Sequence, residues 1–322
     1  MKFKQTFHVF VDNFNIIYKQ LLYRLIILAV TSIICTLGVY PFIKQLINSP
    51  QLNELVGSAK DFIMNLLNGE VSELSEISKR VQAAYADFMA LLNTEVSHLV
   101  LAAFLLLIIF LISRWFTGIG NYATASVIND RMALRANSPF FSTMIRTLKD
   151  STVYNAIYVP LSILYDIAVA VAMFFLLFTL LSSVIPFLLS VFLFILVIIV
   201  SLILKMTFTT DWLPALIRGK KGQLGSFKYT FSQRGKNTLS VMSNFSVLTI
   251  LVFAINAAAV VLTFGVGLLI TIPSSYVILI CFEFVNYYNR EGLKYFIDDR
   301  TIVSTAGDKP VTRESFFRGD DE

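Results

Sequence analysis

Six apolar runs, each long enough to cross a lipid bilayer, constrain this chain more strongly than any other feature of its sequence. A helix needs about 20 predominantly apolar residues to cross the hydrocarbon core. The runs that meet this length cover residues 21–40, 96–116, 161–181, 184–204, 241–265 and 266–288. In lipid, a helix satisfies every backbone polar group within its own segment. The sequence therefore predicts an all-α fold, a polytopic integral membrane protein with six transmembrane helices.

Composition supports this class. Hydrophobic residues make up 56% of the chain and charged residues 15%, whereas soluble domains contain about 25% charged residues. The mean hydropathy is +0.72.

The two cysteines, Cys35 and Cys281, both lie inside apolar runs. This position favours their interpretation as small buried hydrophobic residues over a disulfide or a metal site. We expect the first run to remain in the mature chain, because it is too long for a signal peptide and no small-residue cleavage site follows it.

The fifth and sixth runs form one apolar stretch of 48 residues, 241–288. We place the turn between them near Gly265-Val266-Gly267, because glycine adopts the backbone conformations that tight turns require. The competing break is Ile272-Pro273-Ser274, where proline would interrupt a helix.

The distribution of cations predicts the orientation. Residues 41–95 carry 4 Lys and Arg together with 7 acidic residues, whereas the shorter segments 117–152 and 205–240 are basic. By the positive-inside rule, both basic loops and both termini lie in the cytoplasm and residues 41–95 lie outside. The predicted location is therefore the cell (plasma) membrane, with a six-span domain over residues 21–290.

Residues 1–20 have apolar side chains at helical spacing. This stripe contains Phe3, Phe7, Phe10, Val11, Phe14 and Ile17. It predicts an amphipathic helix lying in the membrane interface and leading into the first span. The alternative is a soluble arm that packs on another domain.

Residues 41–95 contain two apolar stripes at helical spacing, separated by Asn68-Gly69. They predict a hairpin of two amphipathic helices on the outer face. We favour a structural role, because each stripe is needed to pack one helix on the other. A partner-binding surface is the alternative.

The two basic cytoplasmic loops, 117–152 and 205–240, resemble each other. Each contains an apolar segment followed by basic residues, and then a short amphipathic helix. In the first loop Ser138 is the candidate N-cap and Pro139 the first helical residue, and in the second loop Ser226 is the candidate N-cap. The pattern indicates a duplicated unit of span, basic interfacial helix and span. Anionic lipid headgroups are the expected partners of the basic side chains. These are Arg131, Arg135, Arg146, Lys149, Arg218, Lys220, Lys221, Lys228, Arg234 and Lys236.

The second loop carries a series of Pro, Gly, Ser-aromatic and Arg-Gly-x-Asn positions that leads into the fifth span. The residues are Pro214, Gly222, Ser226, Phe227, Arg234, Gly235 and Asn237. This pattern resembles the membrane domain that precedes some bacterial glycerophosphoryl diester phosphodiesterases, and related six-span bacterial proteins of unknown function. The resemblance implies fold and membrane location. It implies no catalytic role, because the phosphodiesterase domain with its acidic and histidine metal ligands is absent.

Motifs for phosphate, zinc or nucleophilic chemistry are also absent from the sequence. A lone Gly118-Ile119-Gly120 has no strand before it and is interpreted as a flexible helix end. We therefore predict no catalytic residues, no metal and no cofactor. The pI of about 9.1 does not indicate nucleic acid binding, because the cations lie beside the spans. The charged cytoplasmic tail covers residues 291–322, and from Asp298 it is expected to be largely disordered after its first few residues.

Asp166 and Glu283 are the two acidic residues inside apolar runs, where a charge is expensive and needs a partner. Their positions place both roughly 9–11 Å from the cytoplasmic edge. Arg114 and Lys205 end two spans at a similar level, and Asn256 in the fifth span could extend the polar cluster. The cluster is interpreted as neutralising ion pairs, with Asp166 bound to Arg114 or Lys205. A polar track for an ion or headgroup is the alternative.

Two functions remain open from the sequence. The first is a non-enzymatic membrane component that scaffolds or regulates other subunits or handles lipid at the inner leaflet. The second is a transporter or an ABC-type permease subunit whose basic loop helices couple to a cytoplasmic ATPase. A membrane-embedded enzyme is disfavoured, because the two carboxylates lack His, Ser or Cys partners at matching depth.

Overall fold

A computed structural model of the chain describes residues 2–68, 74–182, 187–219, 221–298, 301–303 and 311–312. Within these residues six helical segments are long and apolar enough to cross a membrane, which confirms the predicted all-α polytopic fold. The segments are Asn15–Gly38, Val96–Leu134, Leu148–Leu176, Phe192–Ile217, Thr238–Thr263 and Leu268–Arg290. The chain divides into two compact units, a smaller one, Ile26–Arg114, and a larger one, Met1–Leu25 with Trp115–Glu322.

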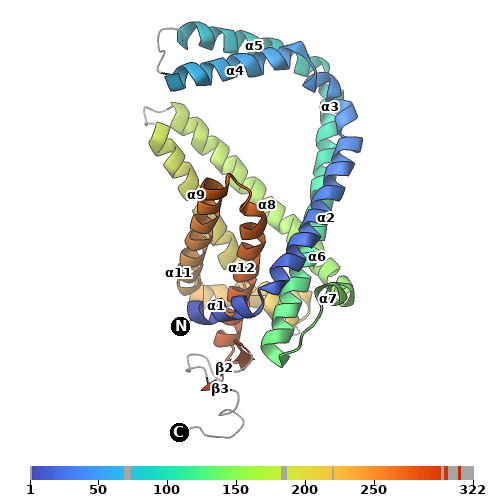
Figure 1. Cartoon of the computed structure of the whole chain (residues 1–322), viewed down its shortest axis with the longest axis vertical. Helices are drawn as coiled ribbons and strands as arrows, with labels where there is room; N and C mark the ends of the chain where they lie inside the picture. The colour runs from blue at the N-terminus through green and yellow to red at the C-terminus, as the bar shows by residue number, and fades with distance from the viewer. Residues whose placement is uncertain are drawn as a thin grey trace. The chain divides into compact units, whose positions relative to one another are not determined.

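The smaller unit contains the predicted helical hairpin. After α3 (Tyr40–Ile47), helices α4 (Pro50–Asn68) and α5 (Leu74–Thr94) pack along each other (Figure 1). Ser49 Oγ accepts a hydrogen bond from the backbone N–H of Leu52 at 3.2 Å and so caps the start of α4. The hairpin prediction is confirmed, although residues 69–73 at its turn lie outside the described part of the chain.

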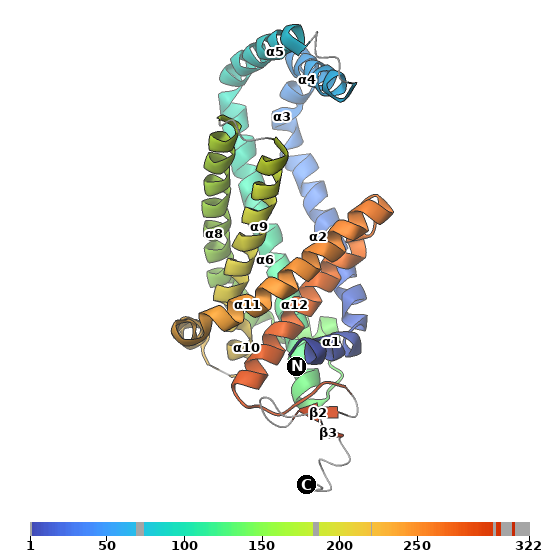
Figure 2. The ribbon, with the colours of Figure 1, turned by 90° about the vertical axis from the view of Figure 1, so that its left-hand side faces the viewer.

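The larger unit holds most of the helices. They are α1 (Lys2–Asp12), α7 (Phe140–Arg146), α8 (Leu148–Ser182), α9 (Phe187–Thr209), α10 (Trp212–Ile217), α11 (Gln223–Thr263) and α12 (Leu268–Arg290), with the start of α2 (Asn15–Gly38) and the end of α6 (Val96–Leu134). Helix α9 packs against both α8 and α11, and α11 against α12. Helices α1 and α10 lie at the end of this unit that also carries the strands (Figure 2). We call this end, with α1, α7, α10 and the strands, the α1 end.

The apolar core of the larger unit lies at the α1 end. It joins α1 and the first turns of α2 to the last turns of α6, to α10 and to α12. Its fully buried members include Ile16, Ile17, Ile128, Met132, Cys281, Phe284, Val285, Tyr287 and Tyr288. The second half of α12 is therefore enclosed by protein, and its polar side chains must find partners there.

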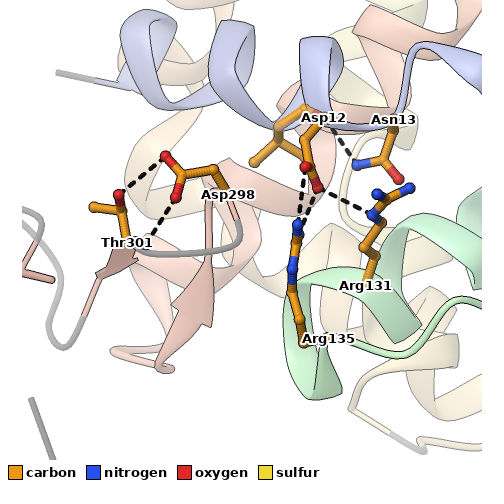
Figure 3. Close-up of polar contacts among 7 residues, drawn as sticks. Asp12, Asn13, Arg131, Arg135, Asp298 and Thr301 are labelled. Carbon is orange, nitrogen blue, oxygen red and sulfur yellow. Dashed lines mark hydrogen bonds and ion pairs between the residues drawn. The ribbon is translucent and has the colours of Figure 1, made fainter. Parts of the chain in front are cut away.

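Three short strands follow α12. They form an antiparallel sheet in the order β1 (Tyr295–Phe296), β2 (Thr301–Val303), β3 (Val311–Thr312). Asp298 closes the β1–β2 turn by accepting hydrogen bonds from Thr301 N at 2.7 Å and Thr301 Oγ1 at 2.9 Å (Figure 3). The expectation of little regular structure from Asp298 onward is wrong for β3, which pairs with β2, while Tyr295 and Val303 are buried in the core and anchor the sheet. The other tail positions after Asp298 lie outside the described residues.

The N-terminal amphipathic helix is shorter than predicted. Helix α1 ends at Asp12, and a second helix starts at Asn15 and continues as the first span. The face of α1 that packs on the protein is mainly polar, with Gln5, Thr6 and Val9 buried, while Phe7 is 59% exposed. The phenylalanine stripe is divided: Phe3 stacks on Phe282 and Phe10 packs against the core, whereas Phe7 and Phe14 are exposed and available to a membrane interface.

The first basic segment is more helical than its interpretation as a loop implied. Helix α6 continues through Gly118-Ile119-Gly120 to Leu134, so the interpretation of these glycines as a helix end is wrong. They admit close neighbours instead: a Cβ on Gly118 would lie 2.0 Å from Asn155 Oδ1, and one on Gly120 would lie 2.4 Å from Tyr23 Cε1. The helix continues because residues 122–129 are buried in the core.

The two predicted serine caps are also wrong. Ser138 Oγ donates to Asp130 at 2.7 Å, and Pro139 is the residue that precedes α7. Ser226 lies inside α11, which begins after Gly222, and its Oγ donates to the carbonyl of Lys221 at 2.6 Å. Both hydroxyls satisfy local acceptors, a competition common for serine.

The turn between the last two spans lies where the glycines predict it. Helix α11 ends at Thr263, Phe264 and Gly265 have φ angles of 49° and 88°, and α12 begins at Leu268. Pro273 lies inside α12, so the alternative break at residues 272–274 is wrong.

Replacing Gly120 with Ala is expected to destabilise the protein by about 1 to 3 kcal/mol, the usual range for overpacking a filled site. The Tyr23 ring cannot simply withdraw, because its hydroxyl donates to Phe116 O at 2.8 Å. Gly57 in α4 is the matched control, since a Cβ there meets nothing within 4 Å. Gly57→Ala should stabilise the protein by about 0.5 to 1 kcal/mol through helix propensity. Thermal unfolding in detergent measures both, and an unchanged midpoint for Gly120→Ala would refute the close packing.

Candidate functional site

A cavity of about 100 Å³ lies within the larger unit, among α6, α8, α9, α10 and α12. Its lining is mainly apolar, with polar side chains from Asn121, Tyr122, Tyr154, Asn155, Tyr158, Thr209, Tyr276 and Glu283. We call it the Glu283 cavity. The cavity is partly open, and the helices around it are apolar enough to cross a membrane, so a charge inside is less screened than one in bulk water.

Helix α8 supplies a fixed aromatic wall. Tyr154 and Tyr158 are one helical turn apart, and their rings stack with centroids 5.2 Å apart and planes 13° apart. The Trp212 ring of α10 meets both edge-on, at 5.4 and 6.0 Å. Tyr122 of α6 lies 5.8 Å from Tyr154. The tyrosines of this wall are therefore held by packing.

Asn155 contributes a hydrogen-bond acceptor to the same wall. Its side chain is fully buried, and its Nδ2 donates to Ser151 O at 2.7 Å. This bond leaves Oδ1 as the atom beside Gly118, and Oδ1 has no hydrogen-bond partner among the described residues. A buried acceptor left this way costs roughly 1 to 3 kcal/mol, which marks it as a position where a ligand or water could donate.

Glu283 brings a carboxylate to the cavity from α12. Its chain neighbours Phe282 and Phe284 are fully buried, and Glu283 itself is half-buried and lines the cavity. The prediction singled out this residue as a charge inside a span. The structure places it in a tyrosine-lined cavity.

A guanidinium lies against the cavity wall. Arg24 of α2 has its guanidinium carbon 3.9 Å from the centre of the Tyr276 ring, and its Nη2 donates to Asn121 Oδ1 at 3.2 Å. Both Tyr276 and Asn121 line the cavity. Arg24 Nε is buried without a hydrogen-bond partner in the described part of the chain. The wall thus combines a negative group, Glu283, with a positive one beside it.

Asp166, the other intramembrane carboxylate, is paired. Lys205 Nζ lies 2.6 Å from Asp166 Oδ1, and the side chains are 17% and 38% exposed. Tyr165 from the same turn donates to Ser201 O at 2.7 Å and links α8 to α9 beside the pair. Lys205 is thus one of the two cations predicted for Asp166. Neither member of the pair is among the residues that line the Glu283 cavity.

Asn256 is not part of a cluster around Glu283. It donates to Ser275 Oγ at 2.9 Å and accepts from Thr271 Oγ1 at 2.8 Å, which ties α11 to α12. Thr271 precedes Glu283 by twelve residues, or about 18 Å of helix. Arg114 belongs to the smaller unit, where its guanidinium lies 5.2 Å from the Phe110 ring centre.

Several of the predicted headgroup-binding cations make contacts within the protein. Asp12 of α1 binds Arg131 Nε at 3.0 Å and Arg135 Nη1 at 2.5 Å (Figure 3). Arg146 pairs with Asp130 at 2.8 Å. These ion pairs hold α1 and α7 to the end of α6.

The remaining predicted cations divide into three groups. Arg218 and Lys221 lie over tyrosine rings, at 5.4 Å from Tyr288 and 3.4 Å from Tyr229. Lys149 and Lys228 are exposed and free to meet a surface. Lys220 and the side chains of Arg234 and Lys236 lie outside the described part of the chain.

A second ionic network fixes the end of α12. Arg290 Nη1 lies 2.7 Å from Asp211 Oδ2, and its Nη2 donates to Tyr229 Oη at 3.1 Å. Tyr229 in turn donates to Glu291. Burial raises the pKa of Tyr229, and the bond to Glu291 raises it further, so the hydroxyl keeps its proton and acts as a donor.

Sequence reasoning missed Arg24, Asn155 and the cavity tyrosines Tyr122, Tyr154 and Tyr276. Arg24 lies one turn inside the first apolar run, where a charge is itself a signal. The spacing of Tyr154, Asn155 and Tyr158 at the start of the third span was a weaker signal. Nothing in the sequence indicates that Gly118 opens room for Asn155.

Among the described residues, no group of three or more His, Cys, Asp or Glu side chains is arranged to hold a metal ion. Comparison with family models, curated proteins and solved structures gives no match for this chain.

Proposed function

We propose that this chain is a non-enzymatic protein of the plasma membrane that handles lipid at the α1 end. The observation that supports this most is the Glu283 cavity, which offers fixed polar groups within a bundle of membrane helices. The lining residues include a carboxylate, tyrosine hydroxyls and amides but no His, Cys or Ser, a set of groups that suits the binding of a small polar ligand.

The outward face of α1 supports lipid contact at the same end. An exposed row of aromatic side chains runs from α1 to the start of α2 and contains Phe7, Phe14 and Tyr18. The ring centroids of Phe14 and Tyr18 are 5.9 Å apart. The polar face is occupied by protein: Gln5 Oε1 accepts from Asn289 Nδ2 and Tyr295 Oη, both at 3.1 Å. An aromatic stripe beside an anchored polar face is suited to the boundary between headgroups and acyl chains.

The proposed orientation puts the α1 end and both termini in the cytoplasm. Three exposed cations can meet anionic headgroups: Lys4 on α1, and Lys149 and Lys228 near the starts of α8 and α11, which follow α7 and α10 in the chain. The α4–α5 hairpin then lies outside.

Cysteine labelling tests this orientation. In a background with Cys35→Ala and Cys281→Ala, Glu76→Cys in α5 should react with an impermeant thiol reagent in intact cells. Lys228→Cys should react only after permeabilisation. Both native side chains are exposed, so access is decided by the membrane alone. Labelling of Lys228→Cys in intact cells would place this part of α11 outside the cell and contradict the proposed orientation.

The competing function is a permease subunit whose short loop helices couple to an ATPase. Helix α10 is a poor candidate for coupling, because Trp212, Leu213 and Ala215 are buried within the bundle. Helix α7 is more open, with Ile145 71% exposed, and keeps this alternative testable.

Copurification separates the two functions. After mild extraction from native membrane, we expect native mass spectrometry to find a phospholipid retained by the protein and no stoichiometric ATPase. An ATPase that is lost when Ile145 is changed to Ser would support the permease. If this protein lost its phospholipid as readily as an unrelated six-span protein does, the result would contradict lipid handling.

A further inference from the structure

We propose that the Glu283 cavity binds the ammonium group of an aminoalkyl phosphate, with Arg24 facing the attached phosphate. This inference rests on the proposed lipid-handling function and names the headgroup chemistry of the same site. The shared chemistry occurs in an ethanolamine phospholipid and in free phosphoethanolamine.

The wall of the cavity is complementary to a cation. Glu283 supplies a carboxylate, and the tyrosines of the lining supply hydroxyl oxygens that can accept hydrogen bonds from an ammonium group. Asn155 Oδ1 adds a neutral acceptor without a partner among the described residues, which an N–H of the ammonium group could fill. Hydrogen bonds in which one partner is charged are stronger than hydrogen bonds between neutral groups.

The size of the cavity fits a small amine. Its volume of about 100 Å³ is several times the roughly 15 Å³ that a single water requires. An ammonium group with two carbons therefore fits, whereas an acyl chain does not. The acyl chains of a lipid would remain outside among the exposed apolar side chains of the spans.

The position of Arg24 beside the cavity favours a ligand in which the amine is attached to an anionic group. Its guanidinium rests on Tyr276 and Asn121 at the cavity wall, and its buried Nε has an unfilled donor. Gln20 donates to the same Asn121 oxygen at 3.1 Å and fixes that amide. Guanidinium groups bind phosphate oxygens well, so the two charges beside one cavity favour a zwitterion over a simple amine.

Lipid exchange into nanodiscs tests the proposal. Wild-type protein is placed in nanodiscs of phosphoglycerol lipid, with ethanolamine phospholipid of the same acyl chains titrated in, and retained lipid is measured by native mass spectrometry. We expect preferential retention of the ethanolamine lipid. Glu283→Gln should weaken that preference about tenfold or more, and Arg24→Gln should weaken it severalfold. Arg80→Gln, which removes an exposed cation on α5 of the hairpin, should leave it unchanged.

A second arm separates the sources of the ligand. Free phosphoethanolamine is added to protein in detergent, and the unfolding midpoint is recorded. Should Glu283→Gln fail to fold, Tyr158→Phe replaces it, since loss of the hydroxyl oxygen should also weaken binding severalfold.

The outcomes are distinct. Equal retention of both lipids would overturn the ammonium site and leave lipid handling standing. Stabilisation by free phosphoethanolamine without lipid retention would support the ammonium site and contradict lipid handling. Failure of both probes to bind would overturn both.

Discussion

Asp211→Asn is expected to lower the stability of the protein by about 3 to 5 kcal/mol, the usual effect of removing one partner of a buried ion pair. Asp211 is fully buried and Arg290 is 16% exposed, so the guanidinium left behind could not be solvated. Arg290 also holds Tyr229 and thereby joins α10, α11 and the end of α12. We expect a large drop in the thermal unfolding midpoint in detergent.

The control is the ion pair between Arg146 and Asp130, in which Arg146 is 62% exposed. Arg146→Gln should change stability by less than about 1 kcal/mol, because exposed pairs contribute little. Equal midpoints for the Asp211 and Arg146 variants would contradict the structural role of the buried pair.

Asp166→Asn is expected to have an effect of similar size, because it leaves the Lys205 ammonium group without its 2.6 Å partner inside an apolar span. The double variant Asp166→Asn with Lys205→Met should recover much of the lost stability, since replacing both members of such a pair with neutral or apolar groups is often nearly neutral. The measurement is again the unfolding midpoint, with each single variant beside the double one.

A transport role for Asp166 predicts a different result. If Asp166→Asn kept its stability but abolished a pH-dependent flux in proteoliposomes, the carboxylate would be a proton carrier and the structural interpretation would be wrong.

The architecture of the membrane helices could be predicted because it depends on local properties of the chain. The length of each apolar run, the glycines at 265 and 267 and the stripes of the hairpin are enough to place the spans and the last turn. The intramembrane charge at Asp166 was also visible, since a lone carboxylate in lipid requires a nearby cation.

The candidate site could not be predicted because it depends on which face of each helix meets protein. The phenylalanine stripe of α1 predicts a side that faces the membrane, yet its spacing does not indicate that Phe3 stacks on Phe282 while Phe7 stays exposed. The cations near α7 suggested headgroup binding, yet Arg131 and Arg135 bind Asp12, more than a hundred residues away. Pairings at such separation leave no periodic signal in one sequence.

The cavity shows the same limit. Gly118 on α6 admits Asn155 on α8, while Arg24 on α2 reaches Tyr276 on α12. Apart from the charge of Arg24 inside an apolar run, each residue alone is unremarkable in its own segment, and the packing of helices distant in sequence creates the site.

Photo-crosslinking with a phospholipid that carries a diazirine in its headgroup is the most direct test of lipid handling at the Glu283 cavity. After irradiation in nanodiscs and digestion, we predict adducts in the segments 154–158 of α8 and 276–283 of α12. A matched lipid with the diazirine at the end of an acyl chain should instead label outward-facing residues such as Val171 and Phe174, which are 50% and 66% exposed. Headgroup adducts confined to such outward-facing positions, with none in the two cavity segments, would contradict the proposed function.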